Sequence, residues 1–167
     1  ASEGDFHAGL NMAAVHKAPV IFFCRNNGYA ISTPANEQFK GDGIACRGVG
    51  YGIKAIRVDG ADILAVYKAT QMARDYALEH EEPILIESIA YRLGAHSSSD
   101  DPSGYRSKEE EEMWRKNDPI SRFRLWLVKQ GWLNEDEDKA KSDALRQEIL
   151  DALKVAEKVA KPGIEHL

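Results

Sequence analysis

The order of apolar and polar positions along the chain predicts buried strands alternating with amphipathic helices. The first apolar run, Val20 to Cys24, has no polar interruption, which is typical of a central strand buried on both faces of a parallel sheet. Residues 53–58 and 84–92 predict two further strands. Between them, apolar side chains recur about every 3.6 residues over 62–80, which predicts a helix. This strand–helix–strand order favours an α/β fold, with a parallel sheet flanked by helices and right-handed connections.

The region before the second strand predicts two shorter helices. A helix following Ser2-Glu3-Gly4-Asp5, with Ser2 or Asp5 as its cap, places apolar side chains on one face: Phe6, Leu10, Ala13 and Ala14. Residues 41–52 are rich in glycine, yet contain no G-x-G-x-x-G, so a dinucleotide-binding Rossmann domain is disfavoured. A short helix between Ile44 and Tyr51 is expected there, with the glycines at packing and turn positions.

The last third of the chain reads as helical. A charged helix begins at Lys108, and a second runs from Asp118-Pro119 to about Gly131, with Phe123, Trp126 and Leu127 facing inward. A long amphipathic helix is expected over 135–160, with this apolar line: Leu145, Ile149, Leu153, Ala156 and Val159 or Ala160. The acidic runs 109–112 and 135–138 are interpreted as solvated helix surface. We therefore expect an α/β part, residues 1–107, and a C-terminal helical part of the same domain, residues 108–167.

Composition limits the classes of partner. The chain has 167 residues, a net charge of −5 and 43% hydrophobic residues, which suits one globular domain or a large piece of one. The acidic balance does not favour nucleic acid or a membrane surface as the main partner. Cys24 and Cys46 lack metal-ligand spacing, and Cys24 is expected to act as a small apolar residue of a core strand. Because the chain starts at Ala1 and enters a motif-like sequence at once, we expect a mature or excised fragment.

Polar residues follow the first strand immediately, at the sheet edge where open α/β folds bind ligands. The amide oxygen of Asn27 is a suitable ligand for Mg²⁺, and the Arg25 guanidinium suits a phosphate group. Together they predict a metal–phosphate site. A hairpin or simple turn at Asn27-Gly28 is the alternative, since Asn-Gly is a strong turn signal. The spacing alone leaves both interpretations open.

A second polar loop, residues 94–107, follows the strand over 84–92 and is expected to face the first loop. His96 in this loop is the best candidate for an acid or base, and an exposed loop histidine is the alternative. His16, His80 and His166 are interpreted as surface residues. Serines 97 to 99 lack the G-x-S-x-G context of a hydrolase nucleophile. Asp100, Asp101 and Arg106 are expected to pair across the loop and hold its shape.

Three ordered motifs carry a family resemblance: 24–34 (CRNNGYAISTP), 57–60 (RVDG) and 91–101 (YRLGAHSSSDD). Together they resemble the α subunits of thiamine-diphosphate-dependent 2-oxo acid dehydrogenases, most closely those of the branched-chain type. The likeness extends from Ala1 to about Pro162. It implies a partial thiamine-diphosphate-binding fold and an enzyme that decarboxylates branched-chain 2-oxo acids and transfers the acyl group to lipoamide.

The resemblance also implies roles for individual residues. Arg25 and His96 contact the diphosphate, and His96 acts in the acyl transfer. Asn27 and the backbone oxygen of Tyr29 bind Mg²⁺. Ser97 matches a main inhibitory phosphorylation site and Ser107 a second one. Four further residues match those that order the loop and dock the lipoyl domain: Arg92, Asp100, Tyr105 and Arg106.

The same resemblance implies partners and an incomplete site. The acidic Mg²⁺ ligand at the start of the family motif is expected just before Ala1, and a further carboxylate comes from a β subunit in an α2β2 assembly. This chain alone is thus not expected to form a complete active site. The other implied partners are a lipoyl-bearing dihydrolipoyl acyltransferase and a regulatory kinase and phosphatase. The expected location is the mitochondrial matrix, with a bacterial cytoplasm as the alternative.

Two functional alternatives accompany this hypothesis. Within the same class, the chain is a pyruvate or acetoin dehydrogenase α subunit. In a different class, it is a non-catalytic module whose loop 94–107 is a docking site regulated by phosphorylation.

Overall fold

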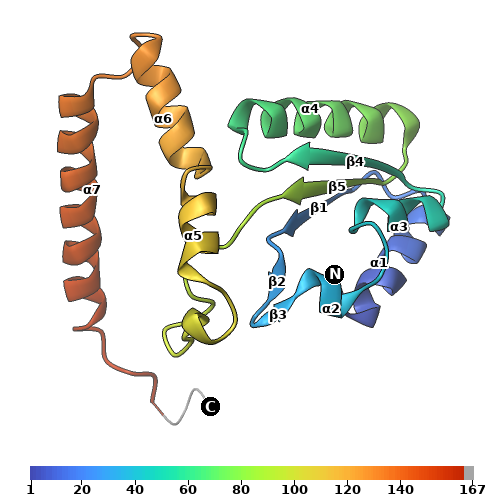
Figure 1. Ribbon diagram of the computed structural model, residues 1–167, viewed down its shortest axis with the longest axis horizontal. Coiled ribbons are helices and arrows are strands. Elements are labelled where there is room, and N and C mark those ends of the chain that lie inside the picture. Colours follow the sequence, from blue (N-terminus) through green and yellow to red (C-terminus); the bar gives the residue numbers. More distant parts are fainter. Residues whose placement is uncertain (164–167) are drawn as a thin grey trace. The chain divides into compact units, whose positions relative to one another are not determined.

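The computed structural model describes residues 1–163, and His166 lies outside them. In the described residues, the main sheet has three parallel strands in the order β1–β5–β4 (Figure 1). These are β1 (Ile21–Asn26), β4 (Lys54–Asp59) and β5 (Ile84–Ile89). All three strands therefore end at the same edge, with Asn26 and Asp59 both level with Ile89.

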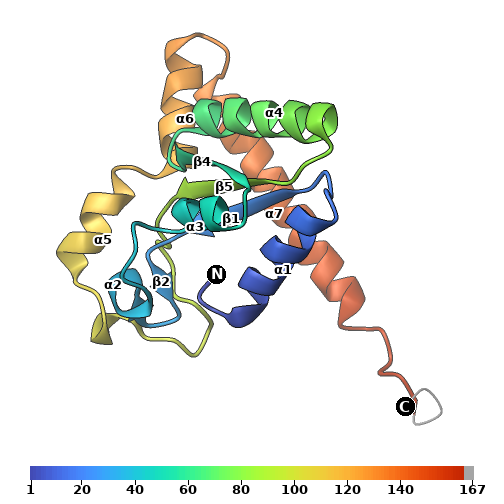
Figure 2. The ribbon, with the colours of Figure 1, turned by 90° about the vertical axis from the view of Figure 1, so that its right-hand side faces the viewer.

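Helices cover both faces of the sheet (Figures 1 and 2). Helix α4 (Ile63–His80) packs on one face, where Ala73 and Ala77 meet Ile84 and Ile86. Helices α1 (Gly4–Val15) and α3 (Ala45–Gly50) lie on the other face. Its core contains Leu10, Ile44, Ile53 and Leu85, with Phe6, Ala14, Phe22 and Cys24 packed against them. The predicted parallel α/β sheet flanked by helices is confirmed, as is the apolar face of the first helix.

The central strand is β5, so the prediction that the run Val20–Cys24 forms the central strand is wrong. Residues 84–88 of β5 are buried, whereas Val20 is 40% exposed and Phe23 is 45% exposed. The physical reason is that β1 pairs with β5 along one edge only, so part of its apolar run lies at the rim. The strand also continues through Arg25 and Asn26, so these polar residues form its C-terminal end and do not lie in a loop.

A small antiparallel hairpin follows β1, formed by β2 (Tyr29–Ala30) and β3 (Thr33–Pro34) and leading into α2 (Ala35–Gln38). Its reversal lies at Ile31, which has φ 56°, and not at Asn27-Gly28. A hairpin at Asn27-Gly28 is therefore wrong, whereas the alternative of a simple turn at this pair is confirmed, because the pair forms a separate turn before the hairpin.

The remaining boundaries differ from the predictions by a few residues. Asp62 caps α4 by accepting a hydrogen bond from the Ala65 amide at 3.0 Å, and Glu81 ends the helix with φ 52°. The expected short helix is α3, and the last strand ends at Ile89 rather than residue 92. Helix α7 (Glu135–Ala156) ends four residues before the predicted 160. Its predicted apolar line is exposed in the described chain, with Leu145 50%, Ile149 62% and Leu153 53% accessible.

The chain divides into two compact units, residues 1–123 and residues from 124 onward. Helix α5 (Lys108–Arg115) belongs to the first unit, and α6 (Pro119–Lys129) runs from the first into the second. Within the second unit, Trp126 packs edge-on against Trp132 at 5.3 Å, and Arg124 forms an ion pair with Asp138 at 2.9 Å. The domain division expected at 107/108 stays a prediction. Within residues 1–163, no helix has the length and apolarity needed to cross a membrane.

Candidate functional site

The turn after β1 is fixed by two asparagine side chains in succession. The Oδ1 atom of Asn26 accepts a hydrogen bond from the Gly28 amide at 3.2 Å, and Oδ1 of Asn27 accepts one from the Tyr29 amide at 3.1 Å. Gly28 has φ 82°, a conformation that a side chain disfavours. The amide of Ala90 donates to the Asn26 carbonyl at 2.8 Å, which joins this turn to the end of β5. We call residues 26–29 the asparagine turn.

A buried carboxylate lies beneath this turn. Glu87 on β5 is fully buried and accepts hydrogen bonds from the side chains of Asn26 at 2.8 Å and Arg57 at 3.0 Å. It also accepts from the backbone amides of Ile44 at 3.0 Å and Ala45 at 2.8 Å. Burial alone raises the pKa of a carboxyl group, but the four hydrogen bonds outweigh it and hold the pKa of Glu87 below its ordinary value.

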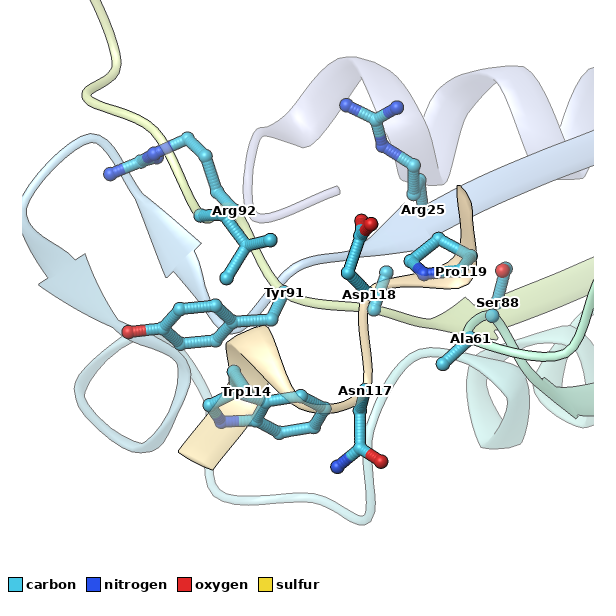
Figure 3. A pocket seen from close by; sticks show the side chains of 12 residues that line it. Arg25, Ala61, Ser88, Tyr91, Arg92, Trp114, Asn117, Asp118 and Pro119 are labelled. Carbon is cyan, nitrogen blue, oxygen red and sulfur yellow. The ribbon is translucent and has the colours of Figure 1, made fainter. Parts of the chain in front are cut away.

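Arg25 lines two cavities at this edge of the sheet. The larger, about 380 Å³, is also lined by Ser88, Tyr91 and Trp114 (Figure 3). Its Tyr91 and Trp114 rings are stacked with centroids 5.1 Å apart, and the Arg25 guanidinium extends away from this pair. The smaller, about 180 Å³, is lined by the asparagine turn. Arg25 makes no hydrogen bond or ion pair with any residue that the structure describes, so its charge is available to a ligand.

Tyr29 connects the asparagine turn to the later part of the chain. Its hydroxyl donates to Glu110 on α5 at 2.9 Å, and its ring lies 5.7 Å from Tyr105 and 6.2 Å from Tyr91. Burial, together with the neighbouring Glu110 carboxylate, raises the pKa of Tyr29 and raises that of Tyr91 to about 12. Both phenols are therefore protonated at neutral pH, and that of Tyr29 donates a hydrogen bond to Glu110.

Asp100 and Arg92 organise loop 94–107 through hydrogen bonds. Asp100 accepts hydrogen bonds from the Tyr105 hydroxyl at 2.6 Å and from the His96 amide at 2.8 Å, which hold the pKa of Asp100 below its ordinary value. Arg92 donates to the Tyr105 hydroxyl at 2.9 Å and to the Ile31 carbonyl at 2.5 Å. The loop is therefore attached directly to the hairpin after β1.

Arg106 is 7% exposed and donates to three backbone carbonyls, those of Arg92, Leu93 and Gly94. It also forms an ion pair with Glu111 at 2.7 Å. The expected pairing of Arg106 with Asp100 and Asp101 is wrong, because Asp101 instead accepts from the Ser103 amide at 3.0 Å and begins a 3-10 turn, η1 (Pro102–Gly104). Arg106 thus fastens the base of the loop, while Asp100 organises its tip.

The predicted site residues are brought together only in part. Arg25, Asn27 and Tyr29 line one cavity, and Arg92, Asp100 and Tyr105 form one hydrogen-bonded chain. His96 is exposed and lies outside the cavities that Arg25 lines. Ser97 is exposed, with its hydroxyl 3.1 Å from that of Ser99, and Ser107 caps α5 by accepting from the Glu110 amide at 3.1 Å. The roles of His96 and the two serines stay predictions. His16 and His80 lie on the surface as expected.

Sequence reasoning missed three carboxylates that shape this region: Glu87, Glu110 and Glu111. The interpretation of 109–112 as solvated surface is wrong for Glu110 and Glu111, which face Tyr29 and Arg106. Asp138 likewise faces Arg124. A usable signal existed for Glu87, since an acidic residue inside the run 84–89 has a basic residue, Arg57, in the neighbouring predicted strand.

The chemistry of these groups suits a metal-bound diphosphate. The Arg25 guanidinium pairs with no residue of the described range 1–163 and suits phosphate oxygens in a forked geometry. Asn27 retains an acceptor lone pair on Oδ1, because a carbonyl oxygen has two and the Tyr29 amide uses one. Neutral oxygen ligands of this kind are typical of Mg²⁺ sites.

The comparisons with known proteins identify the family of the chain. The chain matches the dehydrogenase E1 component family over residues 1–165. It is 56% identical over 164 residues to the mitochondrial 2-oxoisovalerate dehydrogenase subunit alpha of Homo sapiens. The matched segment covers 98% of this chain and 37% of that protein. It is 51% identical to subunit alpha 2 from Arabidopsis thaliana over 99% of this chain and 35% of that protein. The counterpart from Dictyostelium discoideum is 52% identical over 100% of this chain and 38% of that protein. The chain therefore spans somewhat more than a third of the length of these relatives. It belongs to the dehydrogenase E1 component family.

Proposed function

We propose that this chain is part of the α subunit of a branched-chain 2-oxo acid dehydrogenase. The proposed reaction removes CO₂ from a branched-chain 2-oxo acid and transfers the remaining acyl group to a lipoyl group, whose disulfide is reduced. The observation that carries the proposal is the asparagine turn. It presents Asn27 at the sheet edge close to Arg25, which pairs with none of the described residues, in a chain 51–56% identical to proteins named 2-oxoisovalerate dehydrogenase subunit alpha.

The residues at this edge are proposed to hold thiamine diphosphate through Mg²⁺. Arg25 and His96 bind the diphosphate oxygens, and Asn27 with the Tyr29 carbonyl binds the metal. When bound, thiamine diphosphate supplies the carbanion chemistry of decarboxylation, while the protein supplies position and electrostatics. His96 also moves a proton during transfer of the acyl group to the lipoyl group. The exposure of its loop suits a residue that must meet a group carried by another protein.

The proposed partners follow from this chemistry. A β subunit in an α2β2 assembly completes the site, and a lipoyl-bearing dihydrolipoyl acyltransferase receives the acyl group. Arg92, Asp100, Tyr105 and Arg106 order the loop that meets the lipoyl domain, and their hydrogen bonds support this role. Because the relatives are named as mitochondrial proteins, we propose the mitochondrial matrix as the location.

Regulation by a kinase and a phosphatase is proposed at Ser97 and Ser107. A phosphate on Ser97 adds about −1.5 to −2 charges three residues from Asp100, whose carboxylate holds the loop tip. Repulsion is expected to release the His96 amide and the Tyr105 hydroxyl. This loosens the loop while leaving the asparagine turn intact.

The test uses the full-length α subunit assembled with its β partner. Calorimetry with Mg²⁺ and thiamine diphosphate should show binding that Asn27→Ala and Arg25→Met each weaken, while the exposed-surface variant Arg74→Met binds like the parent. Decarboxylation should favour 3-methyl-2-oxobutanoate over pyruvate. A preference for pyruvate overturns the branched-chain assignment in favour of a pyruvate or acetoin dehydrogenase. An assembly that binds no thiamine diphosphate supports a docking module regulated by phosphorylation instead.

A further inference from the structure

Glu87 has an unusual set of neighbours for a buried carboxylate, because every polar contact it makes is with a donor. Oε1 accepts from the Asn26 side chain and the Ile44 amide, and Oε2 accepts from the Ala45 amide and the Arg57 side chain. Two oxygens thus receive four hydrogen bonds. A neutral glutamine cannot replace this group, since its NH₂ must face two donors in either orientation.

One of these four bonds sets the conformation of the asparagine turn. Glu87 binds the Nδ2 atom of Asn26, which leaves Oδ1 of the same amide directed at the Gly28 amide. A buried acceptor therefore decides which end of the Asn26 amide faces the turn. The Gly28 bond fixes the backbone immediately beside Asn27 and one residue before the Tyr29 carbonyl.

The other three bonds hold Glu87 itself in place. The Ile44 and Ala45 amides belong to the start of α3, and Arg57 lies directly opposite on β4. Arg57 in turn forms an ion pair with Asp42 at 3.0 Å. These three bonds tie the carboxylate to two segments, the start of α3 and β4, so it cannot turn away from Asn26 without leaving several donors unpaired.

We propose that Glu87 is a positioning residue for the metal–diphosphate site and acts through Asn26 on the asparagine turn. This inference rests on the proposed function, because it assigns Glu87 to the turn that binds Mg²⁺. Glu87 itself is fully buried and lines neither of the two cavities that Arg25 lines. Groups that hydrogen-bond a metal ligand directly typically change metal affinity by about 10- to 100-fold when removed, and because Glu87 acts one residue further away we expect the lower end of this range.

The experiment compares Glu87→Gln with Glu79→Gln, in which the same chemical change occurs at an exposed position of α4. Both variants are made in the full-length α subunit assembled with its β partner. Mg²⁺ is titrated by calorimetry at saturating thiamine diphosphate, and amide hydrogen exchange is followed in the cofactor-free assembly. Glu87→Gln should bind Mg²⁺ about 10-fold more weakly. It should also speed exchange of the Gly28 amide, while Glu79→Gln changes neither.

A second variant covers the case in which Glu87→Gln does not fold. Asn26→Ala removes the link to the turn but leaves Glu87 with its three other donors. It should reproduce both the weaker Mg²⁺ binding and the faster Gly28 exchange. If either variant folds and retains the parent Mg²⁺ affinity and Gly28 exchange, the inference is overturned. If the unmodified assembly binds no cofactor, the proposed function fails, and Gly28 exchange alone decides whether Glu87 holds the turn.

Discussion

Replacing Gly43 with alanine tests whether the space around Glu87 is as tightly filled as the structure indicates. A Cβ atom at Gly43 would lie 2.6 Å from Nη2 of Arg57 and 2.6 Å from Oε1 of Glu87. Both distances are shorter than any ordinary contact. The Arg57 head is 38% exposed and has room to move, but the Glu87 side chain is fully buried and held by four donors. Gly43→Ala must therefore displace hydrogen bonds to a buried charge.

The chain offers a matched control for this substitution. Gly43 has φ 72° and Gly52 has φ 73°, so alanine suffers the same backbone strain at both positions, roughly 1–2 kcal/mol. No atom lies within 4 Å of a Cβ built at Gly52. The difference between the two variants thus isolates the contact with Glu87 and Arg57. Losing one hydrogen bond to a charged group costs about 1.5–3 kcal/mol, and breaking a buried ion pair about 3–5 kcal/mol.

We therefore expect Gly43→Ala to be destabilised by about 2–4 kcal/mol more than Gly52→Ala. The measurement is urea unfolding of the assembled full-length protein, followed by tyrosine and tryptophan fluorescence. Gly43→Ala should also speed exchange of the Gly28 amide, because a displaced Glu87 releases Asn26. Equal losses of stability in the two variants would refute the reasoning, since they would show that the neighbours of Gly43 give way freely.

Three further predictions address the groups around the asparagine turn. Because the folded-state pKa of Glu87 lies below its ordinary value of 4.5, its contribution to stability should be complete above that pH and lost as the pH falls through the lowered pKa. The stability difference between the parent and Glu87→Gln should accordingly shrink on acidification below pH 4.5. Tyr29→Phe removes the hydrogen bond to Glu110 and should lower the free energy of unfolding by about 1 kcal/mol, with faster amide exchange in the asparagine turn and in α5. Ser107→Ala removes the cap of α5 and should also cost about 1 kcal/mol, with faster exchange over 108–115.

Two of these predictions have a matched control variant. Tyr67→Phe makes the same change as Tyr29→Phe at a residue that is 70% exposed on α4, and should leave stability unchanged. Ser142→Ala, at an exposed position of α7, should not alter exchange in α5. A parent-to-Glu87→Gln difference that stays constant across the acid range would contradict the assigned direction of the Glu87 pKa shift. Unchanged α5 exchange in Ser107→Ala would show that the cap is not needed.

Much of the secondary structure could be predicted because it depends on local patterns. The apolar line of the helix over 62–80 and the polar break after Cys24 both reflect which side chains meet the core. Strand order depends on pairing between distant segments, and the pattern of apolar and polar residues does not predict that pairing. The runs beginning at Val20 and Ile84 look alike in isolation, although only the second is enclosed by strands on both sides.

The asparagine turn and the loop 94–107 could be located because polar residues at strand ends follow from local order. Their supports could not, because each support pairs residues far apart in sequence. Glu87 reads as the polar position of a strand, and Glu110 as one of four acidic residues on a helix surface. Only the fold brings Glu87 to Asn26, 61 residues earlier, and Glu110 to Tyr29, 81 residues earlier.

The asparagine turn is held from two directions, by the buried Glu87 on the sheet and by Glu110 on α5. On the sheet side, the fully buried Glu87 contacts the turn through the half-buried Asn26. On the loop side, Tyr29 reaches Glu110, whose helix is capped by Ser107. A phosphate on Ser107 would lie at the amino end of α5, the helix whose Glu110 accepts the hydrogen bond from Tyr29. The Glu87 side chain, by contrast, is fully buried. We infer that the sheet side sets the geometry of the turn, and that the loop side is where modification can alter it.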